Sequence, residues 1–168
     1  MNKWFSIGIL ASLVIGMVLM GGCTSTGSTS ATPVSSTDGN KAALSKMSET
    51  LHGMKIYTDG MTEGLHNNDM VKAGYYSVLL RNYIDENLPK ARQLADGATT
   101  ENVKASAREH VAYLEDLRAA ANLFAQAADE SKSGYFNGEI ASLNTARTYL
   151  DKANAHLNQS VALLTPSP

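Results

Sequence analysis

Two Glu-x-x-His motifs form the pattern in this sequence that comes closest to a metal site. They are Glu49–His52 and Glu63–His66. In ferritin-like di-iron bundles the same motif places two ligands on one helix face, and the site takes one inward-facing motif from each of two helices. Here both motifs fall in one expected helix, at heptad positions that face away from its apolar side. We therefore interpret them as solvated Glu–His pairs at helical spacing.

His110 is the second candidate ligand, because it falls among apolar residues of another expected helix. Met47, Met54 and Met61 recur on the apolar side of the first helix, so a Met–His site for a metal or haem stays open as an alternative. Packing explains both features, since Met commonly fills cores and a buried His commonly hydrogen-bonds a neighbour. We expect His156 at a helix edge. The sequence thus predicts no metal and no cofactor, with His110, Met47 and Met54 as weak candidates only.

No other set of residues predicts catalysis or nucleic-acid binding. The sequence has no Gly-x-Ser-x-Gly elbow, no phosphate-binding glycine loop and no Cys-x-x-Cys-His for haem attachment. Glu139 is a candidate buried acid, but its position near a helix start explains a carboxylate. The 14 Lys and Arg residues against 16 Asp and Glu give a formal net charge of −2, which offers no basic footprint. We predict a protein that is not an enzyme and has no nucleic-acid partner.

Cys23, the only cysteine, has a clearer chemical role. Residues 1–3 carry one positive charge, residues 4–20 carry none, and Gly21 and Gly22 directly precede the cysteine. A charged start, an apolar middle and a small-residue exit are typical of a secretory signal. With a cysteine directly after the small pair, the segment resembles the lipobox of prokaryotic lipoproteins, although Met20 stands where Leu is usual. The resemblance covers only about the first 25 residues.

This resemblance implies that residues 1–22 are a signal peptide, and that the Cys23 thiol receives a diacylglycerol and becomes the new N-terminus. Two fatty acyl chains, palmitate for example, suffice for stable membrane anchoring. We therefore expect the chain on the extracytoplasmic face of a cell membrane or envelope. Two alternatives stay open. One is an uncleaved transmembrane anchor, although the apolar run lies at the lower limit for spanning a bilayer. The other is plain secretion with a free thiol.

Residues 24–40 that follow the cysteine are small and polar, with Val34 as the one large apolar side chain. Such a stretch buries too little surface to offset its ordering entropy, so we expect residues 23–40 to form a lipidated, disordered tether. Residues 165–168 should form a short disordered tail.

Residues 41–164 have the pattern of a helical bundle, with apolar residues at three- and four-residue steps and a single proline, Pro89. Turn and cap residues predict helices over roughly 40–66, 69–96, 100–130 and 134–164. Short connections favour an all-α, antiparallel up-down four-helix bundle. The expected seams of the first, third and fourth helices are Leu44, Met47, Leu51, Met54, Thr58, Met61 and Leu65; Val103, Ala107, His110, Leu114, Leu117, Ala121, Phe124 and Ala128; and Phe136, Glu139, Leu143, Ala146, Leu150, Ala153, Leu157, Ser160 and Leu164.

The two halves of the bundle also match each other. Residues 81–85 (RNYID) align with residues 147–151 (RTYLD) at an offset of 66, and the seams follow the same offset. This match suggests that the bundle consists of two copies of one helical hairpin. Identity between the halves is low elsewhere, so the duplication stays open. Pro89 removes one helical hydrogen bond, so the second helix should either kink near residues 85–88 or split there.

Taken together, these features favour a non-enzymatic, lipid-anchored bundle that binds or scaffolds a partner, such as another envelope protein. The alternative is a ligand-binding or sensor bundle that holds a metal, haem or small molecule between its helices. All seven Tyr residues fall in the bundle, and we expect Tyr75, Tyr76, Tyr83 and Tyr149 at the edge of the core.

Overall fold

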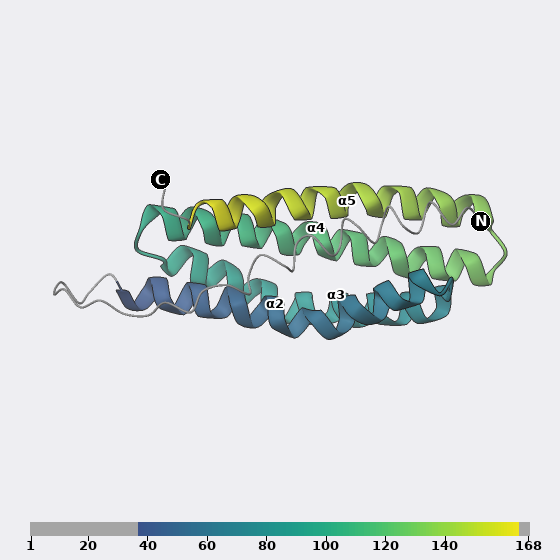
Figure 1. Cartoon of the computed structure of the whole chain (residues 1–168), viewed down its shortest axis with the longest axis horizontal. Helices are drawn as coiled ribbons and strands as arrows, with labels where there is room; N and C mark the ends of the chain where they lie inside the picture. The colour runs from purple at the N-terminus through teal and green to yellow at the C-terminus, as the bar shows by residue number, and fades with distance from the viewer. Residues whose placement is uncertain (1–36, 165–168) are drawn as a thin grey trace.

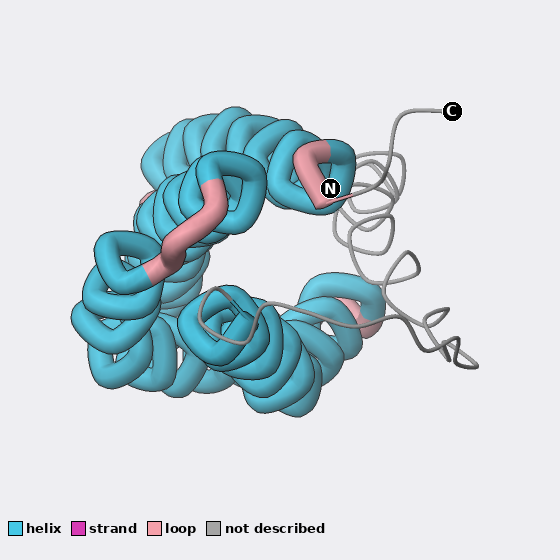
Figure 2. Tube along the Cα trace, turned by 90° about the vertical axis from the view of Figure 1, so that its left-hand side faces the viewer, coloured by secondary structure: helices cyan, strands magenta, loops and turns pink. Residues whose placement is uncertain are grey.

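Four helices account for nearly all of residues 37–164, the part of the chain that the computed structural model describes (Figure 1). They are α2 (Thr37–His66), α3 (Met70–Gly97), α4 (Glu101–Lys132) and α5 (Phe136–Ala162). Each helix packs along the next one in the chain, and α2 also touches α4, while α2 and α5 make at most marginal contact. Figure 2 shows the helices end-on, with the turn between α3 and α4 facing the viewer. The predicted all-α antiparallel four-helix bundle is confirmed.

The expected signal peptide, Cys23 and residues 24–36 of the expected tether lie outside the described residues, as does the tail at 165–168. Within 37–164, no helix combines the length and the apolar character that a bilayer crossing requires.

The first helix begins at Thr37. Residues 37–40, which were expected to belong to the tether, are therefore helical. Asn40 explains part of this difference. Its side-chain oxygen Oδ1 accepts hydrogen bonds from the backbone nitrogens of Thr99 and Thr100, each at 3.3 Å. Thr100 is the N-cap of α4 and Thr99 precedes it, so Asn40 joins the start of α2 to the turn between α3 and α4. Local composition gives no sign of a contact between residues so far apart in the chain.

Helix α3 runs unbroken through Pro89, which excludes the split that the sequence left open. The proline ring is exposed, so it disturbs no packing. Proline has no amide hydrogen, so the carbonyl of Asp85 loses its usual helical donor. Nearby, the side-chain amide of Asn87 donates to the carbonyl oxygen of Tyr83 at 2.9 Å.

The core follows the predicted seams, with Leu51 and Leu164 half-buried and two seam residues exposed. Leu44 is 38% exposed, because Ala43 is the residue that α2 buries at that turn. Phe136 is 61% exposed, because it is the first residue of α5 and lies at an end of the bundle. The largest apolar side chains among the fully buried residues come from α2, α3 and α4: Met54, Met61, Leu80, Ile84, Leu114 and Phe124.

The turns of the two hairpins share one backbone hydrogen-bond pattern at the predicted offset of 66. The amide of Asp69 donates to the carbonyl of Gly64 at 2.8 Å, and the amide of Tyr135 donates to that of Glu130 at 2.9 Å. The bonds of residues 67, 68 and 73 recur in the same way at 133, 134 and 139. Asn68 and Gly134, again 66 apart, both have positive φ, at 58° and 75°. The turns thus have the geometry that a duplicated hairpin requires, although duplication itself stays a prediction.

Glycines allow α2 and α3 to approach closely, a feature that the hydrophobic pattern did not reveal. A Cβ atom at Gly60 would lie 2.5 Å from the ring of Tyr76. One at Gly64 would lie 2.5 Å from the backbone nitrogen of Ala73. The same two positions in the second hairpin carry Gln126 and Glu130, whose side chains hydrogen-bond each other at 2.9 Å. The two hairpins thus differ in the residues that face each other near their turns.

Candidate functional site

Helix α4 buries His110, which is 1% exposed. Neither ring nitrogen, Nδ1 or Nε2, has a hydrogen-bond partner among the described residues. The imidazole ring of His110 lies beside the ring of Tyr113, and the two ring centroids are 5.8 Å apart. A neutral imidazole offers one donor and one acceptor, and buried polar groups in proteins are nearly always paired. His110 is therefore the polar group of the core that most needs an explanation.

Burial also controls the charge of His110. Desolvation lowers the pKa of its imidazole to about 4, because the positive form loses its hydration inside the bundle. At neutral pH the ring is therefore uncharged and keeps a free lone pair.

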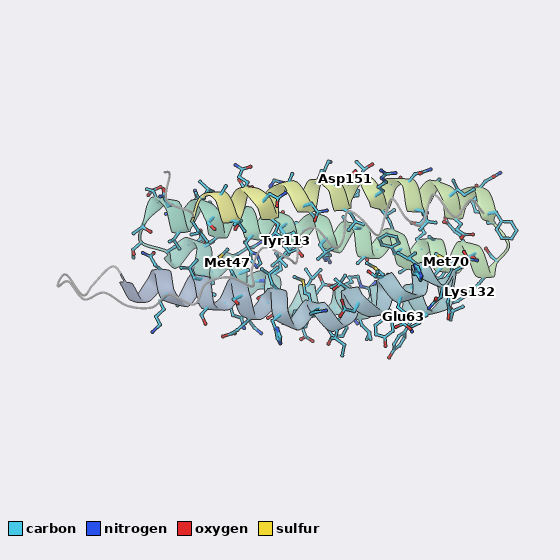
Figure 3. The ribbon with its side chains drawn as sticks, in the orientation of Figure 1. Met47, Glu63, Met70, Tyr113, Lys132 and Asp151 are labelled. Atoms are coloured by element: carbon cyan, nitrogen blue, oxygen red, sulfur yellow. The ribbon has the colours of Figure 1, made fainter. Side chains whose placement is uncertain are left out.

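A small cavity lies beside His110 between α2, α3 and α4. Its volume is about 10 Å³, room for one atom-sized occupant such as a water molecule. Met47 is the only sulfur-bearing residue on its wall and is 5% exposed. Figure 3 shows Met47 and Tyr113, one helical turn from His110, in the half of the bundle where α2 begins. The wall consists of Ala43, Lys46, Met47, Thr50, Ala91, Leu94, Ala107 and His110.

The structure thus brings together two of the three weak metal candidates and separates the third. Met54 is buried at 1% exposure in the main core and does not line the cavity. Met61 lies in the same core cluster. The expected location of His156 at the helix edge is confirmed, since its Nδ1 lies 2.6 Å from Glu109 Oε2 and its Nε2 lies 3.6 Å from Asp116.

The two Glu-x-x-His motifs face solvent, as predicted, with all four side chains exposed. Their carboxylates pair with lysines instead, Glu49 with Lys46 at 3.1 Å and Glu63 with Lys72 at 2.6 Å. Among residues 37–164, no group of three or more His, Cys, Asp or Glu gathers as metal ligands would.

Glu139 is buried at 2% exposure in the first turn of α5, where its seam position made it a candidate buried acid. The other polar exception on that seam, Ser160, is explained by a partner. Ser106 Oγ and Ser160 Oγ each donate to the other residue's carbonyl, at 2.8 and 2.9 Å. Ser160 thus joins α5 to α4 through Ser106.

A second, larger hollow of about 270 Å³ lies on the surface between α3 and α4. Its charges balance, with Arg92 and Arg108 against Asp96 and Glu115. Arg92 is already bound to Glu115 at 2.6 Å. The hollow therefore has no net charge that would select an ionic ligand.

Exposed apolar side chains occur where α3 and α5 begin, at the same end of the bundle, a feature that the sequence prediction missed. Of the seven large hydrophobic residues exposed in the described part of the chain, five lie in the turn at 133–135 or within the first six residues of α3 or α5. The expectation that Tyr75 lies at the core edge is wrong, since its side chain is 60% exposed. These five residues, which we call the apolar end, are Val71, Tyr75, Tyr135, Phe136 and Ile140, with exposures of 60%, 60%, 60%, 61% and 47%.

Comparison with known proteins gives no assignment for these features. No family model matches the chain, and no curated protein or solved structure matches it either.

Proposed function

We propose that the chain is a membrane-anchored extracytoplasmic lipoprotein whose helical bundle binds a protein partner and performs no catalysis. The observation that supports binding is the apolar end. Exposed apolar side chains that lie together can mark an interaction site, and Tyr and Phe are enriched where proteins meet.

The position of the apolar end fits an anchor at Cys23. Both turns that carry it lie at the end of the bundle opposite the start of α2 (Figure 1). An α-helix rises 1.5 Å per residue, so the 30 residues of α2 separate the two ends by about 45 Å. A lipid on Cys23 would hold the start of α2 near the membrane and present the apolar end away from it. The partner is then a protein with an apolar recess that accepts aromatic side chains.

Replacement of the lipidated residue tests the anchor. Cys23→Ser removes the only thiol, so no diacylglycerol can be attached and lipoprotein processing should fail. We expect the wild-type chain in the detergent-soluble membrane fraction, with a shift to lower mass from removal of residues 1–22. The variant should lose both the acyl chains and this cleavage, as shown by fatty-acid labelling and mass. Labelling that persists in Cys23→Ser would contradict the anchor.

A photo-crosslinking residue tests the apolar end. Placed at Phe136 in intact cells, it should give a discrete protein adduct, because this side chain would lie in the partner's recess. Ile56 provides the matched control, since it is 67% exposed in the middle of α2. We expect no such adduct from position 56. Adducts that are equal at both positions, or absent at 136, would argue against docking at this end.

The alternative of a bundle that holds haem is not supported by the cavity. A haem is far larger than a space of about 10 Å³, so its binding would require the core around His110 to open. A ligand the size of a single atom would fit this space without opening the core.

A further inference from the structure

The wall of the His110 cavity offers an unusual pair of donors. His110 contributes an imidazole with no partner, and Met47 contributes a thioether. No carboxylate and no thiolate lines the cavity. The hydroxyl of Thr50 is already engaged, since it donates to the carbonyl of Lys46 at 2.8 Å. The free donors are therefore one nitrogen ligand and one soft sulfur ligand.

We propose that His110 and Met47 bind a soft monovalent metal ion, Cu(I) or its analogue Ag(I), between α2 and α4. Thioether sulfur selects soft ions, and imidazole nitrogen also binds copper. Calcium and magnesium instead require several oxygen ligands. Structural zinc sites use four ligands drawn from Cys, His and acidic side chains. Neither set is present at this cavity.

Size and charge favour the same class of ion. A space of about 10 Å³ admits a single atom and excludes organic ligands. A buried charge is costly when its ligands do not neutralise it, and that cost is lower for a monovalent ion than for a divalent one. Neither ring nitrogen of His110 has a hydrogen-bond partner among the described residues, so a lone pair is available to a metal.

One residue of the cavity wall is partly exposed at the surface. Lys46 lines it with a side chain that is 31% exposed, whereas Met47 and His110 are buried. A lysine ammonium would repel a cation, but here it is bound to Glu49 at 3.1 Å. The acidic partner offsets this charge where an ion would enter.

Titration with Ag(I) tests the proposal. The full chain carrying Cys23→Ser is used throughout, because a thiol would itself bind silver. We expect saturable binding of one Ag(I) per chain by calorimetry, and displacement of Cu(I) from a colorimetric Cu(I) chelator. Met47→Leu preserves side-chain volume and should weaken binding by at least about tenfold, since even residues outside the ligand shell change metal affinity by 10–100-fold.

Met61→Leu is the matched control. Met61 is fully buried on the same helix but does not line the cavity, so this variant should bind Ag(I) within about twofold of the parent, as expected for a residue remote from the ligands. The NMR signals of the His110 ring nitrogens should shift on binding in the parent chain. A parent chain that binds no Ag(I) would mean that only solvent enters the cavity, and the proposal would fail. Equal affinities for the Met47→Leu and Met61→Leu variants would overturn it as well.

Discussion

Gly64→Ala should be among the most destabilising single substitutions in the bundle. The new Cβ would lie 2.5 Å from the backbone nitrogen of Ala73 and 3.0 Å from the carbonyl oxygen of Asp69. Backbone atoms cannot rotate away as a side chain can, so α2 and α3 would have to separate at their turn. Overpacking of this kind costs about 3 kcal/mol, and the better helix propensity of Ala returns roughly 1 kcal/mol. We expect a net loss of about 2 kcal/mol in the free energy of unfolding, measured by urea denaturation.

Gly97→Ala provides the control for this experiment. Gly97 ends α3, and a Cβ atom there would have nothing within 4 Å. We expect a change of no more than about 0.5 kcal/mol, as is usual for surface positions. If Gly64→Ala were as stable as Gly97→Ala, the close approach of α2 and α3 at Gly64 would be incorrect.

The stability of the bundle should fall as the pH is lowered from 7 to 4, with His110 as a major cause. The unfolded chain binds a proton at this imidazole near pH 6.5, whereas burial lowers the folded pKa to about 4. Protons therefore favour the unfolded chain between these values. The contribution of His110 is fully present above pH 6.5 and is lost as the pH falls toward 4. A shift of this size corresponds to about 3 kcal/mol.

Acidic groups also titrate in this range, so a comparison of variants isolates the histidine. His110→Leu, studied in metal-free buffer, should lose about 3 kcal/mol less stability than the parent between pH 7 and pH 4. His52→Gln removes an exposed histidine and should keep the parent's pH dependence. If the pH profiles of His110→Leu and the parent ran parallel, the imidazole of His110 would not be buried in its neutral form.

Periodicity predicted the helices well, because each one buries a continuous face. Met47, Met54, Met61 and Leu65 occupy the core as their spacing indicates. The close approach of α2 and α3 at Gly64 could not be predicted in this way. A glycine adds nothing to a hydrophobic pattern, even where its missing side chain determines the spacing of two helices. Asn40 was assigned to the tether for a related reason, since its role depends on a turn that lies far along the chain.

The candidate site could be predicted only in part. The sequence places His110 and three methionines on the inner faces of two helices, but it does not fix how far one helix is displaced along the other. That displacement selects Met47 over Met54 as the neighbour of the cavity. The apolar end was missed because Phe136 continues the seam in register, whereas none of the four described helices covers it there.

The anchor at Cys23 is tested most directly by the mass of the N-terminal peptide from the wild-type chain extracted from membranes. We expect a peptide that begins at Cys23 and carries a thioether-linked diacylglycerol, with residues 1–22 absent. A peptide that begins at Met1, or a Cys23 with a free thiol, would contradict the anchored lipoprotein.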